Sequence, residues 1–242
     1  DRTSMDFPQG QSELIRQVAA INPKMVVALM HGAPIDLPWI DDVPAVLDMF
    51  FPGMEGGTAM ADLLFGDATP SGRLTFSWPM KLEDSPAYKL ATQDIDNVYY
   101  TDSLMVGYRY FDTKNIAPRY EFGYGLSYTT FDYGKMKLSR QGDSCIVTMK
   151  IKNSGPKDGA ETVQIYVGQK NCKYTRPVHE LKAFEKVFLK AGESRTISFV
   201  LDKDAFSYWN PDQKTWVRDS DEFTIEAGHS SRDIRRSAKI KF

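Results

Sequence analysis

The chain has 242 residues, of which 42% are hydrophobic and 26% charged, and its formal net charge is −2. This length is large for one domain and sufficient for two, and the apolar content can fill real cores. Because 30 basic residues nearly balance 32 acidic ones, no overall field attracts the chain to nucleic acid or to an anionic membrane. No apolar run approaches the roughly 20 residues that a membrane span needs.

The cysteines and histidines give no sign of a metal centre. Two free thiols at Cys145 and Cys172 are favoured over a disulfide, although both remain open, because a chain of this size does not need a covalent cross-link. Neither cysteine belongs to a C-x-x-C pair, and the three histidines are far apart in the sequence. We therefore predict no metal site and no cofactor.

The first part of the chain has the pattern of an α/β fold. Residues 11–22 carry an apolar stripe at helical spacing, which Pro23 ends. The apolar run Met25–Met30 predicts a strand buried on both faces, and Ala45–Phe51 predicts a second buried strand. A helix followed by buried strands indicates about half of an open sheet with helices packed on it.

The stretch Pro52–Trp78 predicts a glycine-rich turn, a helix, a second turn and a strand. Gly53, Gly56 and Gly57 are expected at backbone angles closed to other residues, so that valine at Gly56 or Gly57 should damage folding. Gly66 is expected where the helix ends. Alternating apolar residues at 74–78 predict a strand with one buried face. Since the stretch contains no nucleophile, it is expected to be scaffold.

Regular structure becomes sparse between Pro79 and Glu121. Only Val98–Tyr100 and Leu104–Phe111 are candidate strands there. A long segment with so little structure is unusual inside a compact domain. We expect it to lie on another part of the protein, with its many aromatic side chains packing a surface or lining a concave site.

After Phe131 the pattern is that of an all-β domain. About seven or eight short alternating strands, separated by turn residues, indicate a two-sheet β-sandwich. The expected strands are Phe131–Leu138, Ser144–Asn153, Glu161–Val167, Phe184–Leu189, Ser194–Leu201, Trp216–Val217, Phe223–Ala227 and Ser237–Phe242.

Several polar residues are candidates for a site, each with a structural alternative. Asp36, Asp41 and Asp42 follow a predicted strand at the sheet edge where α/β proteins place their sites, although a solvated loop is favoured. His31 follows the same strand and either lines a cleft or is a structural histidine. Asp102 lies among tyrosines, an environment suited to holding sugar hydroxyls.

Arg109 alternates with aromatic residues on the predicted strand Leu104–Phe111. It is compatible with ligand binding, but an ion pair with Asp112 or another carboxylate is favoured. The residues alone therefore show an α/β segment and a β-sandwich without a complete catalytic set.

Several motifs together resemble the C-terminal portion of glycoside hydrolase family 3, the β-glucosidase and β-xylosidase family. They occur in the family's order and cover essentially the whole chain: H-G-A-P-I-D-L-P-W at His31–Trp39, the stretch Pro52–Trp78, V-G-Y-R-Y-F-D at Val106–Asp112, F-G-Y-G-L-S-Y-T-T-F at Phe122–Phe131, and the strand pair Asn153–Val167.

The resemblance implies a fold and a division into domains. Residues 1–130 would be the C-terminal part of the family's α/β-sandwich domain, including the connecting segment, and 131–242 a fibronectin type III-like β-sandwich. The family's N-terminal (β/α)8-type barrel would be missing, and with it the aspartate nucleophile. The acid/base glutamate of many members would lie just upstream of Asp1 and Arg2.

The resemblance also implies an activity. Family members remove terminal β-linked sugars with retention, through a covalent glycosyl-enzyme, so the substrate class is β-linked glucosides or oligosaccharides. We expect no catalytic residue in this chain, which alone should be inactive. Asp1, Arg2, His31 and Asp102 are the predicted substrate contacts, although Asp102-Ser103 stands where relatives often carry glutamate. A secreted or periplasmic location follows from the family alone.

The alternative function is a non-catalytic carbohydrate-binding or structural module. Against a binding module, the predicted sandwich offers no obvious aromatic platform, since Tyr166, Trp209 and Trp216 are interpreted as core or hinge residues. A structural module would dock a partner chain that supplies the barrel.

Overall fold

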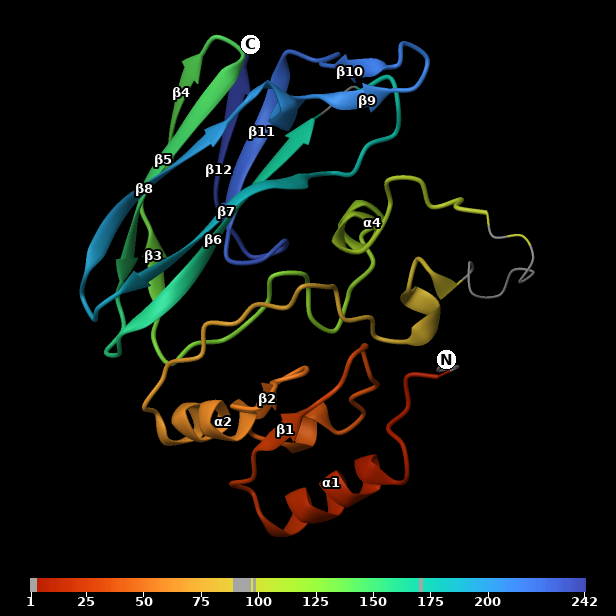
Figure 1. Cartoon of the computed structure of the whole chain (residues 1–242), viewed down its shortest axis with the longest axis vertical. Helices are drawn as coiled ribbons and strands as arrows, with labels where there is room; N and C mark the ends of the chain where they lie inside the picture. Colours follow the sequence, from red (N-terminus) through yellow and green to blue (C-terminus); the bar gives the residue numbers. More distant parts are fainter. Residues whose placement is uncertain (1–3, 89–96, 98, 170–171) are drawn as a thin grey trace.

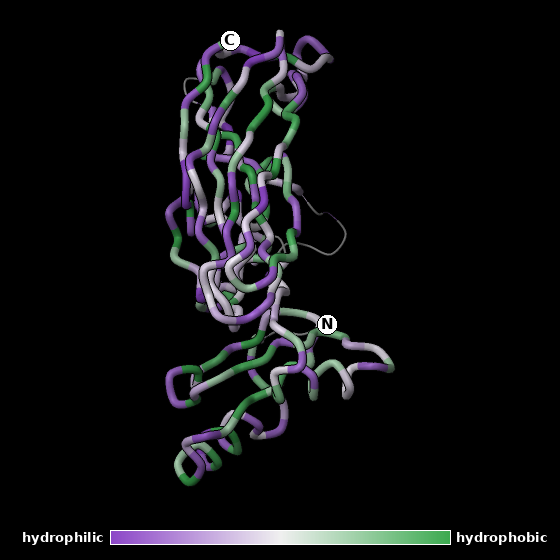
Figure 2. The backbone as a smooth tube through the Cα atoms, turned by 90° about the vertical axis from the view of Figure 1, so that its left-hand side faces the viewer, coloured by the Kyte–Doolittle hydropathy of each residue, from purple (hydrophilic) through white to green (hydrophobic). Residues whose placement is uncertain are grey.

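The structure, a computed structural model, describes residues 4–88, 97, 99–169 and 172–242. A small α/β part and a larger β-sandwich lie one above the other, and the described stretches 66–80 and 115–130 of the connecting segment (residues 66–130) run between them (Figures 1 and 2). The predicted fold class, α/β followed by all-β, is confirmed. Within the described residues, none of the helices has both the length and the apolar character needed to cross a membrane.

The α/β part contains two helices and a two-stranded parallel sheet. Helix α1 spans Gln11–Ile21, and α2 spans Gly56–Phe65. Strand β1 (Val27–Leu29) pairs with β2 (Val46–Asp48) in parallel, with Val27 opposite Val46. A short 3-10 helix, Ile40–Asp42, lies between the strands. The predicted helix and both strands are present, although the strands are shorter than expected.

Strand β1 is not buried on both faces, which corrects the prediction from its apolar run. Val27 and Leu29 are buried, whereas Ala28 between them is exposed. The flanking Val26 and Met30 are also exposed, at 44% and 62%. Apolar residues on the open face of a short sheet are typical of a surface that another protein segment covers.

Two of the glycines predicted around α2 have a backbone that favours glycine, Gly53 in the turn before the helix and Gly66 at its end. Gly53, with φ 71°, and Gly66, with φ 82°, have the left-handed backbone that favours glycine. Gly56 and Gly57 do not, so the predicted reason for their importance is wrong. Gly56 is instead required for space, because a Cβ there would lie 2.6 Å from the Pro52 Cβ.

Alanine substitutions should therefore separate the two adjacent glycines. Gly56→Ala should lower the free energy of unfolding by about 1–3 kcal/mol, because a crowded contact must relax. Gly57→Ala, whose Cβ would meet nothing within 4 Å, should leave it unchanged or raise it by up to about 1 kcal/mol through helix propensity. Urea denaturation of both variants checks this, and equal destabilisation would contradict it.

The predicted strand at 74–78 does not join the β1–β2 sheet. It runs as an extended segment beside residues 119–124, with which it exchanges backbone hydrogen bonds. Trp78 N–H donates to Tyr120 O at 2.7 Å, and Leu74 N–H donates to Tyr124 O at 2.9 Å. Trp78 and Tyr120 form an isolated antiparallel bridge. The connecting segment therefore pairs with itself between the two parts of the molecule (Figure 1).

The predicted strand Leu104–Phe111 is also wrong, because helix α4 spans Tyr108–Thr113. Gly107, with φ 56°, permits the change of direction before it. Helical spacing brings Tyr108, Phe111 and Asp112 toward one side. There Tyr108 stacks on Phe122 with ring centroids 4.8 Å apart, and Phe111 is buried.

The other candidate strand, Val98–Tyr100, begins outside the described residues. Earlier in the same segment, a 3-10 helix spans Leu82–Asp84.

The sandwich has two four-stranded sheets and a separate hairpin. One sheet has the order β12-β11-β6-β7; in the other, β3 and β4 pair with β5, which also pairs with β8. The strands are β3 (Phe131–Tyr133), β4 (Lys137–Gln141), β5 (Ser144–Asn153), β6 (Gly159–Gln169), β7 (Glu180–Leu189), β8 (Ser194–Leu201), β11 (Glu222–Gly228) and β12 (Ile234–Lys241). The hairpin joins β9 (Tyr208–Asn210) to β10 (Thr215–Val217), after a 3-10 helix at Lys203–Phe206.

The sandwich core lies between the two sheets and contains residues such as Val147, Ile165 and Ile225. Cys145 belongs to it, and both cysteines are free. The predicted strand Phe131–Leu138 is in fact two strands, because the chain leaves β5 after β3 and returns to it as β4.

Two tryptophans of the sandwich are not where the sequence placed them. Tyr166 is fully buried, as expected for a core residue. Trp209 and Trp216, on the β9–β10 hairpin, are 51% and 58% exposed. Of the two alternatives, core or hinge, the core alternative is therefore wrong for these two tryptophans.

Candidate functional site

His31 lies at the carboxyl end of β1 and is held on both sides of its ring. Its Nδ1 is 2.8 Å from Ala33 O, and since a carbonyl only accepts, this nitrogen donates. Its Nε2 is 3.0 Å from Asp48 Oδ1 at the end of β2. The parallel pairing of the strands brings both side chains to the same sheet edge.

The surroundings of the His31–Asp48 pair are apolar. The His31 ring lies 5.1 Å from Trp78 and 5.4 Å from Phe50, and its side chain is buried. Burial raises the pKa of Asp48, although His31 and the Phe50 N–H oppose this. The geometry corresponds to the structural alternative for His31, with Asp48 as a partner that the sequence did not indicate.

A cavity of about 350 Å³ lies beside this pair. Its described walls are formed by the loop after β1 and by parts of the connecting segment, namely Gly32–Pro34, Phe76, Ser77, Pro79, Ser85, Pro86, Gly107 and Phe111. The Ser77 hydroxyl is buried there without a hydrogen-bond partner. The cavity is a concave place at the sheet edge, and none of the described residues in its walls has a charged side chain.

None of the other candidate residues that the structure describes lines this cavity. Asp41 and Asp42 are exposed, which agrees with the favoured solvated loop, and Asp36 is half-buried. Asp102 is half-buried in the turn before α4, close in sequence to Gly107 in the cavity wall. Asp1 and Arg2 lie outside the described residues.

The described residues contain no group of three or more His, Cys, Asp or Glu that could hold a metal ion. The charged side chains that are deeply buried lie instead where the connecting segment meets the sandwich.

The first of these buried clusters is centred on Glu161 of β6, whose side chain is fully buried. Arg73 Nη2 lies 2.8 Å from Oε2, and the Tyr133 hydroxyl donates to Oε1 at 2.7 Å. His229 Nδ1 is 2.6 Å from Oε1, while its Nε2 is 2.9 Å from Gly125 O. Burial, followed by the Glu161 carboxylate, raises the pKa of Tyr133 strongly. The cluster joins two stretches of the connecting segment, at Arg73 and Gly125, to both sheets of the sandwich.

The second cluster holds α4 against the sandwich. Asp112 Oδ1 accepts from Arg232 Nε at 2.6 Å, and Arg232 Nη2 also donates to the Phe111 and Ile116 carbonyls. His179 lies between Asp112 at 3.2 Å and Glu226 at 2.8 Å. Sequence reasoning missed this role for His179; the only signal was its place before the apolar pattern of β7.

Arg109 forms an ion pair, as favoured, but its partner is Glu180 at 3.4 Å and not Asp112. Glu180 also contacts Arg176. Asp112 is instead bound by Arg232 and His179, and Glu180 is the carboxylate that pairs with Arg109.

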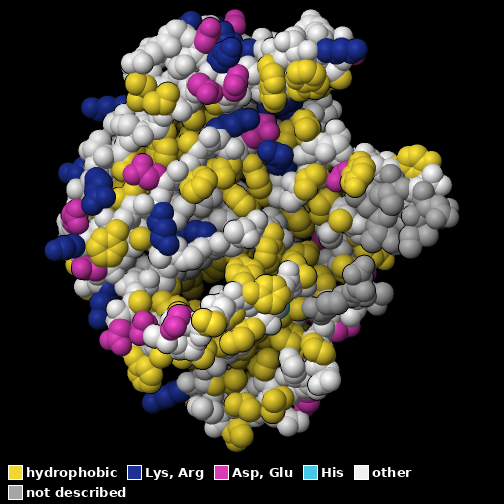
Figure 3. Space-filling view, in the orientation of Figure 1, with side chains coloured by type: hydrophobic (Ala, Val, Ile, Leu, Met, Phe, Trp, Pro, Cys, Tyr) yellow, Lys and Arg dark blue, Asp and Glu magenta, His cyan; other side chains and the backbone are white. Residues whose placement is uncertain are grey.

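The α/β part exposes a large apolar surface, which Figure 3 shows as hydrophobic side chains gathered over the lower half of the molecule. Its members come from α1, the flanks of β1, the turn before α2 and the end of α2. They are Leu14, Ile21, Val26, Met30, Phe51, Met54 and Phe65, and Met54 is fully exposed. Surfaces of this kind mark contacts with other protein segments.

Comparison with known proteins gives the same order of domains. The model of the "Glycosyl hydrolase family 3 C-terminal domain" matches residues 1–128, and that of the "Fibronectin type III-like domain" matches 161–231. Thermostable beta-glucosidase B of Acetivibrio thermocellus is 46% identical over 97% of the chain, and an exo-alpha-(1->6)-L-arabinopyranosidase of Bifidobacterium longum is 42% identical over 99%.

The three-dimensional similarity extends over the whole chain. The crystal structure of a GH3 beta-glucosidase of Bifidobacterium adolescentis covers 100% of it with a TM-score of 0.97 and 41% identity. The chain corresponds to only 36% of that structure and to 32% of each curated relative named above. It therefore spans the C-terminal third of these relatives.

Proposed function

Because this chain belongs to glycoside hydrolase family 3, we propose that it is the C-terminal part of an exo-acting, retaining β-glycosidase that removes terminal β-linked sugars. The observation that carries the proposal is the similarity along the entire chain, in sequence and in fold, to enzymes named β-glucosidases. Both the thermostable relative and the solved structure are named β-glucosidases, so β-glucosides are the substrate class to test first. The relative named for an arabinopyranoside gives the second class to test.

In this proposal the chain supports a catalytic site whose nucleophile lies in the barrel. The exposed apolar surface of the α/β part supports this, because a two-stranded sheet with one open face is what remains when neighbouring strands and helices belong to another segment. Residues 1–130 and 131–242 would be the two domains of this part. Asp1, Arg2 and Asp102 remain predicted substrate contacts, and His31, enclosed beside Asp48, would act by positioning the loop after β1.

A chimera tests the proposal. The upstream two thirds of the Acetivibrio thermocellus enzyme would be fused to this chain in place of its own matching segment. We expect the chimera to hydrolyse 4-nitrophenyl β-D-glucoside, because the upstream part would come from a relative whose own matching segment is 46% identical to this chain. The parent enzyme is the positive control, and its upstream part alone is the negative control.

The 242-residue chain by itself should release nitrophenol only at the uncatalysed rate, whereas glycosidases exceed that rate at least about a millionfold. Retention requires two carboxylates about 5 Å apart, and the family's nucleophile belongs to the barrel. Robust turnover by the chain alone, or a folded chimera without activity, would contradict the proposed function.

A further inference from the structure

The exposed tryptophan pair of the β9–β10 hairpin has a geometry suited to binding. Trp209 and Trp216 lie directly opposite each other in the antiparallel register. Their ring centroids are 6.1 Å apart and the ring planes meet at 72°. More than half of each side chain is exposed, so the two indoles form an open angled corner. In Figure 3, hydrophobic side chains with a basic one beside them lie at this upper right corner.

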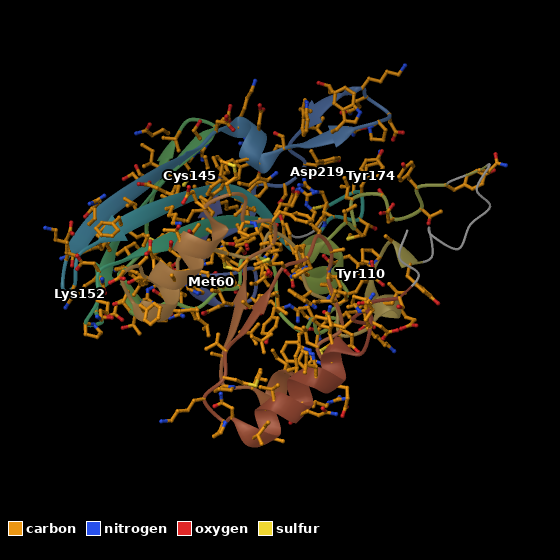
Figure 4. The ribbon with its side chains drawn as sticks, turned by 60° about the horizontal axis from the view of Figure 1, so that its bottom comes forward. Met60, Tyr110, Cys145, Lys152, Tyr174 and Asp219 are labelled. Atoms are coloured by element: carbon orange, nitrogen blue, oxygen red, sulfur yellow. The ribbon has the colours of Figure 1, made fainter. Side chains whose placement is uncertain are left out.

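The opposite face of the hairpin is firmly anchored. Tyr208 is buried, and its hydroxyl donates to Asp219 at 2.9 Å. Its ring also packs on Tyr174 at 5.8 Å; Figure 4 shows Tyr174 and Asp219 next to each other beside the hairpin. Asn210 Oδ1 accepts from the Asp212 N–H at 3.0 Å and fixes the turn. The indoles therefore stand on a preorganised support, which lowers the entropic cost of binding.

The pair is too small for a protein interface. Two half-exposed indoles present on the order of 250 Å², whereas contacts between domains bury roughly 600–1,500 Å². None of the other large apolar side chains known to be exposed in the described part of the sandwich lies on this hairpin or its turn. Packing of the two rings on each other contributes to the hairpin's stability, but it leaves their outer faces open to water.

The chemistry around the pair matches a neutral ligand with an apolar face and a polar rim. Asp212 is bound by Tyr174 and Lys173, whereas Gln213 and Lys214 of the turn are exposed and offer an amide and an ammonium group at the end of the hairpin. A β-linked glucose unit has such faces, since its C–H bonds lie above and below the ring and its hydroxyls lie around the edge. Rings at 72° fit one soluble chain, whereas a crystalline surface would need coplanar rings.

We propose that Trp209 and Trp216 form a binding site for soluble β-linked gluco-oligosaccharides, separate from the cavity beside His31. The choice of ligand rests on the proposed function. The site needs no residue of the barrel, so it should operate in the 242-residue chain.

Indole ¹H–¹⁵N spectra of this chain provide the test, because it has four tryptophans. Cellotetraose should shift the Nε1–H signals of Trp209 and Trp216 saturably. The signals of Trp39 and Trp78, which are buried, should stay in place and show that the chain is folded. Trp216→Ala should weaken binding at least about tenfold, as expected for a central aromatic contact. Phe184→Ala, at an exposed position on β7, is the matched control and should not.

Two results would overturn the proposal. One is the absence of any shift in the wild-type spectrum, which needs no variant and therefore cannot be explained by misfolding. The other is burial of both indoles in the active chimera, seen as loss of quenching by acrylamide, since the barrel would then cover the site. Neither result affects the chimera's hydrolysis of the aryl glucoside, which tests the proposed function separately.

Discussion

Glu161→Gln should lower the free energy of unfolding by about 3–5 kcal/mol, the typical cost of breaking a buried ion pair by removing one charge. The substitution keeps the shape of the side chain but leaves Arg73, which is 8% exposed, without its counter-charge. It also presents an amide to Tyr133 and His229 in place of the carboxylate. Because the Glu161 side chain contacts Arg73 of the connecting segment, Tyr133 of β3 and His229 after β11, the loss should also loosen the connecting segment from the sandwich.

Urea denaturation of the variant and of Glu185→Gln measures the effect. Glu185 is exposed on the neighbouring strand β7, and its substitution should change the free energy by no more than about 0.5 kcal/mol. The double variant Glu161→Leu/Arg73→Met removes both charges and should recover much of the loss. If Glu161→Gln were as harmless as Glu185→Gln, the central role of this cluster would be excluded.

The second large effect concerns pH and His179. Burial alone would lower the pKa of this histidine, but its hydrogen bonds to Asp112 and Glu226 outweigh burial and raise the pKa from 6.5 to about 9. The protonated form is thus favoured in the folded state. Its stabilising contribution is fully present below pH 6.5 and is lost as the pH rises through about 9.

The difference in unfolding free energy between the wild type and His179→Asn should therefore shrink by about 3 kcal/mol between pH 6 and pH 9.5. Comparison with the variant cancels the titration of the other histidines, which both proteins share. Arg232, on the other side of Asp112, keeps its charge throughout this range. A difference that stays constant with pH would show that His179 is neutral in the fold.

This pH dependence bears on the candidate site through α4. His179 and Arg232 hold Asp112, and α4 in turn follows the turn that contains Asp102. Loss of the His179 contacts above pH 9 should therefore release the segment on which the predicted contact Asp102 depends. Measuring the activity of the chimera over the same pH range would connect stability to function.

The sequence by itself determined the fold class, the family and most strands of the sandwich. The bounds of β5 and β8 agree with the predicted ranges, because alternating burial along a strand is a local pattern that neighbouring residues reveal. The same holds for α1, whose apolar stripe repeats at helical spacing. The motifs of the family are likewise local strings, and they sufficed to identify it.

Tertiary structure alone decided what these elements meet. Aromatic residues at 104–111 fit a strand or a helix equally well by sequence, and packing on Phe122 and the bonds of Asp112 selected the helix. An apolar run such as Met25–Met30 cannot tell whether both faces are covered, since the cover lies elsewhere in the chain. The sequence around Glu161 likewise does not show that its side chain is buried beside Arg73, 88 residues away. Nor does the sequence around Trp209 and Trp216 show that these side chains face water. Partners that are distant in sequence leave no periodic signal.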